Sequence, residues 1–315
     1  MHIFINTHVL YSLGGLIMKS NKILIMLLAI FAASMVVSAQ EANIQQLKQT
    51  TENSANNLTS YTYSRSAESM LIYSNNTLRK EYDAYKTTMG KVDLVNKKGW
   101  WGSNLTDEET GDVLTWEGYF INGSENWKEG MNWTSLNVTD TAQVLQAYNE
   151  IPGQVNLIKY SNMKIVGTEK MQGEEYYKII GSPIPSIYSG MIGLQLLAAY
   201  FPSPFALPDK LKNGTLDISN TSLMNNSRIV LTAWISKNDS TLRRLDINSS
   251  LTITPKILNI SSPDFKIMST INESTVYSNF GSPAKIVLPK EAQNASSSRM
   301  IGANWRWALF GSIRP

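Results

Sequence analysis

Two groups of acidic residues are the first candidates for chemistry: Asp107-Glu108-Glu109, which is followed by Asp112, and Glu174-Glu175. A glycosidase places two carboxylates opposite each other across a cleft, and hard cations such as Ca²⁺ bind carboxylate oxygens. The members of each group, however, are adjacent in sequence beside predicted turns, so we interpret them as solvated loop charges. The spacing from Asp107 to Asp112 matches no known calcium loop, and we predict no metal site.

Histidine and cysteine are missing from almost the whole chain. The two histidines, His2 and His8, lie in the N-terminal leader, and there is no cysteine. The Ser-His-Asp triad, the Cys-His pair and the usual zinc sites all need these residues. The sequence therefore predicts a protein that is not an enzyme and that carries no cofactor. The missing cysteines also predict a fold without disulfides, held together by its core.

Aromatic residues are concentrated between residues 100 and 133. The cluster is Trp100, Trp101, Trp116, Tyr119, Phe120, Trp127 and Trp133. Aromatic rings supply a large apolar area with a polar edge, which suits a cavity wall or a sugar platform. The alternative is the ordinary core of a half-buried sheet. The candidates for a ligand cavity are Trp101, Trp116, Tyr119 and Trp127. Along a regular strand, the odd-numbered Trp101 and Tyr119 cannot share a face with their even neighbours.

A strongly apolar helix is predicted over residues 186–208, ending at Pro202 and Pro204. It is apolar around most of its circumference, which is typical of a helix that is buried or lies over an apolar opening. One interpretation is a cavity lid, and the other is a core helix packed against a sheet. The lid candidates are Met191, Leu194, Leu197 and Phe201.

The chain is rich in N-glycosylation acceptor triplets. Composition predicts about five Asn-x-Ser/Thr triplets by chance, and the chain has fourteen, all after residue 40. A Ser/Thr/Asn-rich surface is the alternative to real acceptors. The candidates are Asn57, Asn75, Asn104, Asn122, Asn132, Asn137, Asn213, Asn220, Asn225, Asn238, Asn248, Asn259, Asn272 and Asn294.

The N-terminal region has the layout of a secretory signal. A basic segment that begins at Met18 precedes an apolar run over 23–37 and a small-x-small site at 37–39. We expect export to the cell surface or beyond, with an uncleaved membrane anchor as the alternative. Many acceptors without disulfides suggest an archaeal cell surface. The net charge of +3 is not clustered, which argues against a nucleic-acid partner.

Antiparallel strands are predicted to dominate the mature chain. Residues 60–101 indicate successive strands, and three hairpins follow at 119–127, 163–181 and 228–255. Asn122-Gly123 fits a two-residue type I′ turn. Helices are predicted over 41–57, 139–151 and 186–208, the second capped by Thr139 or Asp140 and stopped by Pro152-Gly153. Leu245, Ile247, Leu251 and Ile253 should share one strand face, with Asp246, Asn248 and Thr252 on the other.

The order of these elements resembles the lipoprotein-carrier superfamily, the exported LolA- and LppX-like lipid-binding proteins. The segments VGTEKMQGEEYYKI and AWISKNDSTLRRLDI resemble two hairpins of that superfamily, and IVLPKEA resembles its closing strand. The resemblance implies an α+β fold in which a strongly curved antiparallel sheet, a half-barrel, is closed by a few helices over an apolar cavity for acyl chains. The N-terminal lipid-attachment Cys of many members is absent here.

Together these features predict residues 1–39 as a leader, 40–293 as one half-barrel domain and 294–315 as a loose tail. The expected function is non-catalytic binding or carriage of a lipid or acyl-chain ligand at the cell envelope. One alternative is a glycosylated structural or adhesive envelope protein with a filled core. The remaining alternative is a carboxylate-dependent hydrolase.

Overall fold

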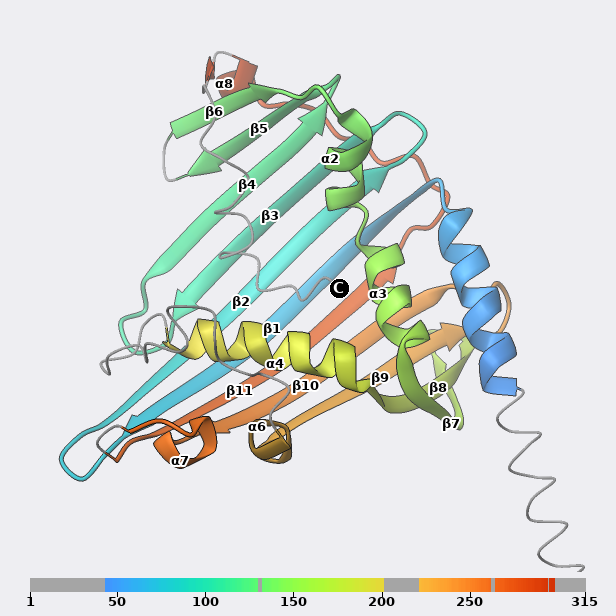
Figure 1. Cartoon of the computed structure of the whole chain (residues 1–315). Helices are drawn as coiled ribbons and strands as arrows, with labels where there is room; N and C mark the ends of the chain where they lie inside the picture. Colours follow the sequence, from blue (N-terminus) through green and yellow to red (C-terminus); the bar gives the residue numbers. More distant parts are fainter. Residues whose placement is uncertain (1–42, 130–131, 201–220, 262–263, 294, 298–315) are drawn as a thin grey trace, which may run out of the picture. The chain divides into compact units, whose positions relative to one another are not determined.

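The computed structural model describes residues 43–129, 132–200, 221–261, 264–293 and 295–297 (Figure 1). The internal contacts of the chain divide it into residues 1–47 and 48–315. The sheet and every labelled helix belong to the second unit. Residues 43–56 are helical, within the predicted first helix. Among the described residues, no helix combines the length and the hydropathy needed to cross a membrane.

One twelve-stranded sheet dominates the fold (Figure 1). Its strands follow the order β12-β6-β5-β4-β3-β2-β1-β11-β10-β9-β8-β7. All neighbouring pairs are antiparallel except β12 with β6. Within the described residues the sheet is curved and open, and β12 and β7 are its edges. The expected α+β fold with a curved antiparallel sheet is confirmed.

The strands are β1 Ser60–Ser74, β2 Arg79–Asp93, β3 Lys98–Asp107, β4 Val113–Ile121, β5 Ser124–Glu129, β6 Asn132–Asn137, β7 Ser161–Met171, β8 Glu174–Pro183, β9 Ser227–Ser236, β10 Leu242–Ile253, β11 Lys266–Ser278 and β12 Ser296–Ser297. The helices are α2 Thr141–Tyr148, α3 Glu150–Lys159, α4 Pro185–Tyr200, α6 Thr221–Asn225, α7 Pro255–Leu258 and α8 Lys290–Gln293.

The predicted hairpins form where glycine and asparagine allow positive φ angles. Asn122 and Gly123 connect β4 to β5 with φ angles of 54° and 76°, as a type I′ turn requires. Gln172 and Gly173 connect β7 to β8 with 50° and 89°. In the third hairpin, β9 and β10 are joined by residues 237–241. The segment IVLPKEA, expected to be a closing strand, instead runs outside the ladder and ends in α8.

The helix boundary at Pro152-Gly153 was predicted wrongly. Asp140 caps α2 as expected, because its side chain accepts a hydrogen bond from the Gln143 amide. The chain then leaves helical geometry at Asn149 and resumes as α3, with Pro152 inside its first turn. The N–H groups of a first turn have no partner within the helix, so the N–H that proline lacks costs nothing there.

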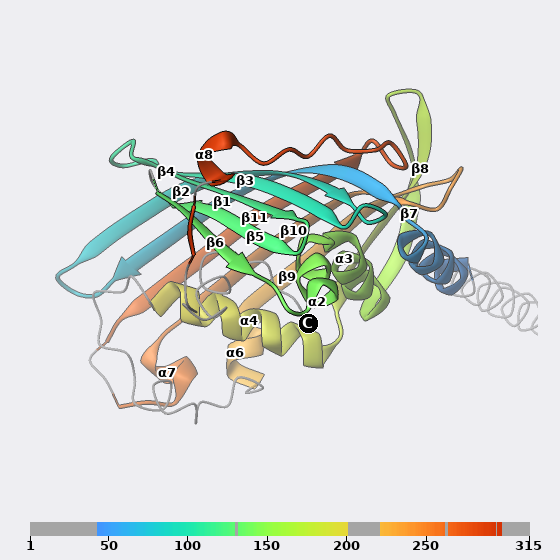
Figure 2. The ribbon, with the colours of Figure 1, turned by 90° about the horizontal axis from the view of Figure 1, so that it is seen from above.

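The two faces of the sheet carry different layers (Figure 2). Helices α2, α3 and α4 lie against one face, called here the inner face, and the segment 279–293 with α8 crosses the other, the outer face. Strand register assigns odd-numbered residues of β1, β3, β5 and β11 and even-numbered residues of β2 and β4 to the inner face. The predicted inward set of β10 packs there: Leu245, Ile247, Leu251 and Ile253 are buried.

Two covered zones hold most of the inner core. At one, α2 and α3 cover Phe120, Val92 and Tyr61, and the Glu150 backbone amide donates to Tyr61 Oη over 2.8 Å. At the other, α4 covers β1 and β11. There Gln195 Nε2 donates to Ser269 Oγ over 3.1 Å, and Tyr73 Oη donates to the Ala199 carbonyl.

Candidate functional site

Between the two covered zones lies a partly exposed apolar surface, called here the inner strip. Its residues project from the inner face of β2, β3, β4 and β5, and five of the six are half-buried. The sixth, Leu114, is 57% exposed. The inner strip consists of Tyr82, Trp101, Leu105, Leu114, Trp116 and Trp127. A surface of this kind can accept an apolar ligand, because further burial of these rings is favourable.

Glycine at position 118 allows the Trp101 ring to approach the neighbouring strand closely. In strand register, Gly118 lies between Trp101 of β3 and Trp127 of β5. A Cβ atom added at Gly118 would come within 2.5 Å of the Trp101 indole. The Trp101 ring therefore occupies the space that a side chain at position 118 would need.

A buried charged cluster borders the inner strip. Arg65 of β1 bonds through its guanidinium to the Glu150 carboxylate of α3 and, over 3.2 Å, to the Glu273 carboxylate of β11. Lys86 of β2 pairs with Ala67 of β1, and Ala67 pairs with Glu273 of β11. On its other side, Lys86 pairs with Leu105 of the inner strip. The cluster thus brings polar groups to the edge of an apolar surface.

Burial shifts the proton affinities of this cluster. Burial alone would lower the pKa of the Arg65 guanidinium, but Glu150 and Glu273 outweigh it and raise that pKa above its ordinary value. The pKa of Lys86 falls to about 8, mainly through burial and also through the Arg65 charge, although Glu273 and Glu150 oppose the change. Burial raises the pKa of Tyr277 well above its usual range. The Tyr277 hydroxyl has no hydrogen-bond partner among the described residues.

The sequence-predicted cavity residues divide between the two faces. Trp101, Trp116 and Trp127 lie together on the inner strip. Tyr119 projects from the outer face, where its ring lies 6.4 Å from that of Trp100 and 5.9 Å from that of Trp133. The Glu117 carboxylate holds this outer cluster, accepting from Trp100 Nε1 over 2.9 Å and from Tyr119 Oη over 2.7 Å. Alternation along β4 separates Tyr119 from Trp116.

The two predicted lid residues whose side chains are described, Met191 and Leu194, differ in exposure. Met191 is buried, together with Ile192, Leu196 and Ala199, whereas Leu194 is 48% exposed. Leu197 lies in α4, but its side chain is outside the described set, and Phe201 lies outside the described residues. The sheet-facing side of α4 is therefore a packed core.

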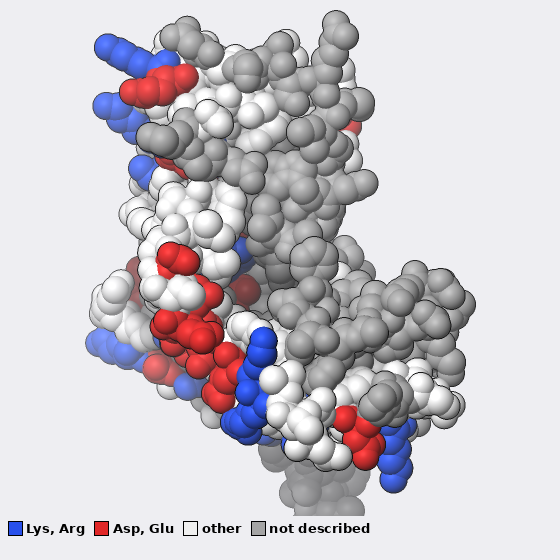
Figure 3. Space-filling model, turned by 90° about the vertical axis from the view of Figure 1, so that its left-hand side faces the viewer, with Lys and Arg blue, Asp and Glu red and all other residues white. Residues whose placement is uncertain are grey.

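The predicted acidic groups form local surface contacts. Figure 3 shows Asp and Glu side chains in a row on the side that carries the β3–β4 turn. The Asp107 carboxylate accepts hydrogen bonds from the backbone amides of its own turn, at Glu109 and Thr110. Glu175 pairs with Lys237 across neighbouring strands. Within the part of the chain that the structure describes, no group of three or more potential ligands could hold a metal ion.

Sequence reasoning missed Arg65, Lys86, Glu150 and Glu273. A signal was available for Arg65, because alternation along β1 places it on the same face as Tyr61 and Tyr63. Glu150 and Glu273 lie far from Arg65 in sequence, and only the strand order brings them together.

Comparisons with known proteins locate similar folds. No family model matches the sequence, and no curated protein matches it. Among solved structures, LprF from Mycobacterium bovis is 16% identical to this chain in sequence, with a TM-score of 0.37. The match covers 79% of this chain and 97% of LprF. LppX from Mycobacterium tuberculosis is 13% identical, covering 78% and 99%, with a TM-score of 0.36.

A LolA-superfamily protein from Nitrosomonas europaea is also similar, at 9% identity, covering 78% and 95%, with a TM-score of 0.20. These similarities concern the class of proteins predicted from the sequence. At such TM-scores they carry no argument about function, which has to come from the residues of this chain.

Proposed function

We propose that this protein binds an amphiphilic, lipid-like molecule on the inner face of the sheet, without catalysing a reaction, at the cell envelope. The observation that carries the proposal is the inner strip: three tryptophans and two leucines on one face, partly exposed between two well-packed zones. Isolated exposed apolar residues are common on protein surfaces, but a contiguous apolar patch marks an interaction site.

The charged cluster favours an amphiphile over a purely apolar ligand. Lys86 is the cross-strand neighbour of Leu105, so a molecule lying along the strip would bring one end close to the Lys86 ammonium and the Arg65–Glu150 pair. A polar or ionised head group can form hydrogen bonds with these side chains, while its apolar part covers the tryptophans.

A non-catalytic role is supported by the chemistry of the same surface. The two carboxylates of the charged cluster, Glu150 and Glu273, both bind the Arg65 guanidinium, so both are engaged within the protein.

Export and surface location are part of the proposal and rest on the signal-like leader and the fourteen acceptor triplets. Acceptor Asn122 occupies an exposed turn between β4 and β5, where a glycan would meet no steric obstacle from the strands. The leader itself lies outside the described residues, and its cleavage stays a prediction.

A structural envelope protein with a filled core is the second candidate, because one observation favours it. Beneath α4, the side chains of Met191, Ile192 and Leu196 are at most 1% exposed, so this part of the interior is packed rather than hollow. On this alternative, the inner strip would be covered by another part of the chain or by a protein partner.

Tryptophan fluorescence distinguishes the two candidates. Brominated acyl chains quench indoles that they contact, so vesicles or micelles containing a brominated phospholipid should quench the protein's emission. We expect the quenched fraction to fall in Trp101→Phe and not to fall in Trp100→Phe, which removes only unquenched emission. Trp100 is the matched control, since it is the neighbouring residue on the opposite face. Equal quenching in both variants, or none in the wild type, would count against lipid binding at the strip.

A further inference from the structure

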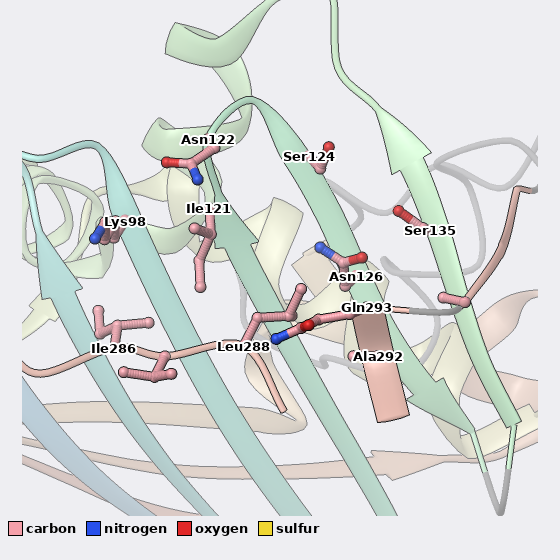
Figure 4. Close-up of a pocket in the computed structure, with 12 residues that line it drawn as sticks. Lys98, Ile121, Asn122, Ser124, Asn126, Ser135, Ile286, Leu288, Ala292 and Gln293 are labelled. Atoms are coloured by element: carbon pink, nitrogen blue, oxygen red, sulfur yellow. The ribbon is translucent and has the colours of Figure 1, made fainter. Parts of the chain in front are cut away.

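A cavity of about 550 Å³ lies on the outer face, opposite the helices (Figure 4). Residues 286–288 and α8 line it together with residues of β3 to β6, and the cavity is partly open to solvent. Its volume falls within the range of small-molecule sites in proteins, roughly 300–1,000 Å³. The inner strip does not contribute to this cavity, because its residues project from the other face.

The lining of the outer cavity is polar but almost uncharged. Lys98 is the one charged residue among the twelve that line it, and no Asp or Glu is present. Five lining residues carry amides or hydroxyls, and the other six are aliphatic. The five polar uncharged residues are Asn122, Ser124, Asn126, Ser135 and Gln293.

Asn126 is the most informative of these residues. It is 3% exposed, it lines the cavity (Figure 4), and its side-chain amide makes no hydrogen bond with any described residue. Ser135 is its cross-strand neighbour on β6 and also lines the cavity. The adjacent polar side chains of Asn126 and Ser135 therefore face a space in which a ligand could form hydrogen bonds with them.

We propose that the outer cavity binds a neutral saccharide of one or two rings. Each sugar hydroxyl both donates and accepts a hydrogen bond, and so do amide and hydroxyl side chains. The aliphatic residues Ile286, Leu288 and Ala292 offer a surface to the C–H face of a sugar ring. An anionic ligand would meet a single cation, Lys98, and an alkyl chain would leave Asn126 unpaired.

The neighbouring aromatic cluster fits the same ligand class. Tyr119 is the cross-strand partner of Asn126 on β4, and its ring belongs to the outer cluster with Trp100 and Trp133. Aromatic rings beside hydrogen-bonding side chains allow a second sugar ring to pack on an apolar surface while its hydroxyls stay paired.

The saccharide has two possible sources. Asn122 and Ser124, the first and third residues of one acceptor triplet, both line the cavity. A glycan attached at Asn122 could place its first sugars inside. Alternatively, the cavity takes a free saccharide from outside. This proposal is independent of lipid binding, since it concerns the opposite face.

The first experiment tests a free saccharide on chain produced in the bacterial cytoplasm, where no N-glycan is attached. Saturation-transfer NMR and calorimetry would be run with glucose, mannose, galactose, N-acetylglucosamine, maltose and cellobiose. We expect saturable binding of at least one of them. The loss of one hydrogen bond in Asn126→Ala or Gln293→Ala should weaken binding about fivefold to tenfold.

Two variants are used so that a failure of one variant to fold does not prevent the test. Gln293 is exposed, so Gln293→Ala should fold even if Asn126→Ala does not, and circular dichroism checks both. The matched control is Asn104→Gln, an exposed amide on β3 that does not line the cavity. It should bind the saccharide as the wild type does.

The second experiment tests the attached glycan on chain purified from its own host. Glycopeptide mass spectrometry should find a glycan at Asn122, and hydrogen exchange should show residues 286–293 protected. Asn122→Gln should remove that protection, whereas Asn104→Gln should keep it. Either positive experiment supports the proposal and identifies the source.

The proposal is overturned if the unglycosylated chain binds none of the six saccharides and Asn122→Gln leaves the exchange at 286–293 unchanged. It is also overturned if a fatty acid or inorganic phosphate binds the cavity and the saccharides do not compete. Neither result would affect lipid binding at the inner strip, which the Trp100 and Trp101 variants test separately.

Discussion

Lys86 offers the sharpest test of the inner-face electrostatics. Its ammonium belongs to a cluster in which Arg65 is also positive, and burial lowers its pKa from 10.5 to about 8. Charged Lys86 is therefore less favourable in the folded chain than in the unfolded chain. Replacement by methionine, which keeps the length of the side chain and removes the charge, should stabilise the fold at neutral pH.

The magnitude follows from the size of that pKa change. Each whole pKa unit corresponds to about 1.4 kcal/mol between the two protonation states, which sets an upper limit of roughly 3–4 kcal/mol for Lys86→Met. Lys86 retains some solvent contact, and screening reduces the effect. We expect a gain of about 2 kcal/mol in the free energy of unfolding at pH 7.

The pH dependence has a defined sign. Between pH 8 and pH 10.5 the unfolded chain holds a proton on Lys86 that the folded chain has released. The contribution of Lys86 to the free energy of unfolding of the wild type therefore increases with pH across that window. Lys86→Met lacks this contribution, so its advantage should be largest at pH 7 and should shrink toward pH 10.

The assay is urea unfolding at pH 7, 8, 9 and 10, followed by circular dichroism. Lys80→Met is the control, because Lys80 lies on the same strand and is exposed. It should change stability by no more than about 0.5 kcal/mol at any pH. The reasoning is refuted if Lys86→Met is less stable than the wild type at pH 7, or if its advantage does not depend on pH.

Three further substitutions test the packing around the same surface. Glu150→Gln leaves the buried Arg65 with only Glu273 as a carboxylate partner and should lower the free energy of unfolding by about 3 kcal/mol. A decrease below about 1 kcal/mol, measured by urea unfolding, would contradict the description of a buried ion pair. Gly118→Ala would place a Cβ atom 2.5 Å from the Trp101 indole, so the ring must move. We expect a loss of about 1–3 kcal/mol in the free energy of unfolding and a shift of the tryptophan emission. An unchanged emission would contradict this packing of Trp101 against Gly118. Gly153→Ala in α3 meets nothing within 4 Å and should stabilise the fold by about 0.5–1 kcal/mol, as thermal unfolding would show.

The hairpins could be predicted because their signals are local. Asn122-Gly123 and Gln172-Gly173 supply the positive φ angles that two-residue turns need, and the alternation in β10 follows from the two-residue period of a strand. The same alternation separates Trp101 from Trp100. Such features depend on a few neighbouring residues, which are all visible in the sequence.

The break between α2 and α3 could not be predicted in the same way. The sequence predicts that Pro152 stops the helix, although proline is well tolerated in a first helical turn. The actual break at Asn149 is held by Tyr61, whose hydroxyl donates to the Asn149 side chain and accepts from the Glu150 amide. Tyr61 lies 88 residues earlier in the chain than Asn149, so no local pattern reports this contact.

The two candidate sites differ in how far sequence could reach them. Trp101, Trp116 and Trp127 were predicted as ligand-contacting residues, and the structure places them on one surface; their role in binding stays a prediction. The outer cavity depends on residues 286–293 crossing β3 to β6, a tertiary contact without a sequence signal. The glycan acceptors, the cleavage of the leader and the archaeal origin likewise stay predictions.

Native mass spectrometry of the chain purified from its own host, without detergent, tests lipid binding most directly. The account predicts one bound amphiphile per chain, released as a lipid on collisional activation. Trp116→Arg, which places a charge on the inner strip, should reduce the bound fraction, and Trp133→Arg on the outer face should not. A wild-type spectrum that shows only the mass of the protein and its glycans would contradict the proposed function.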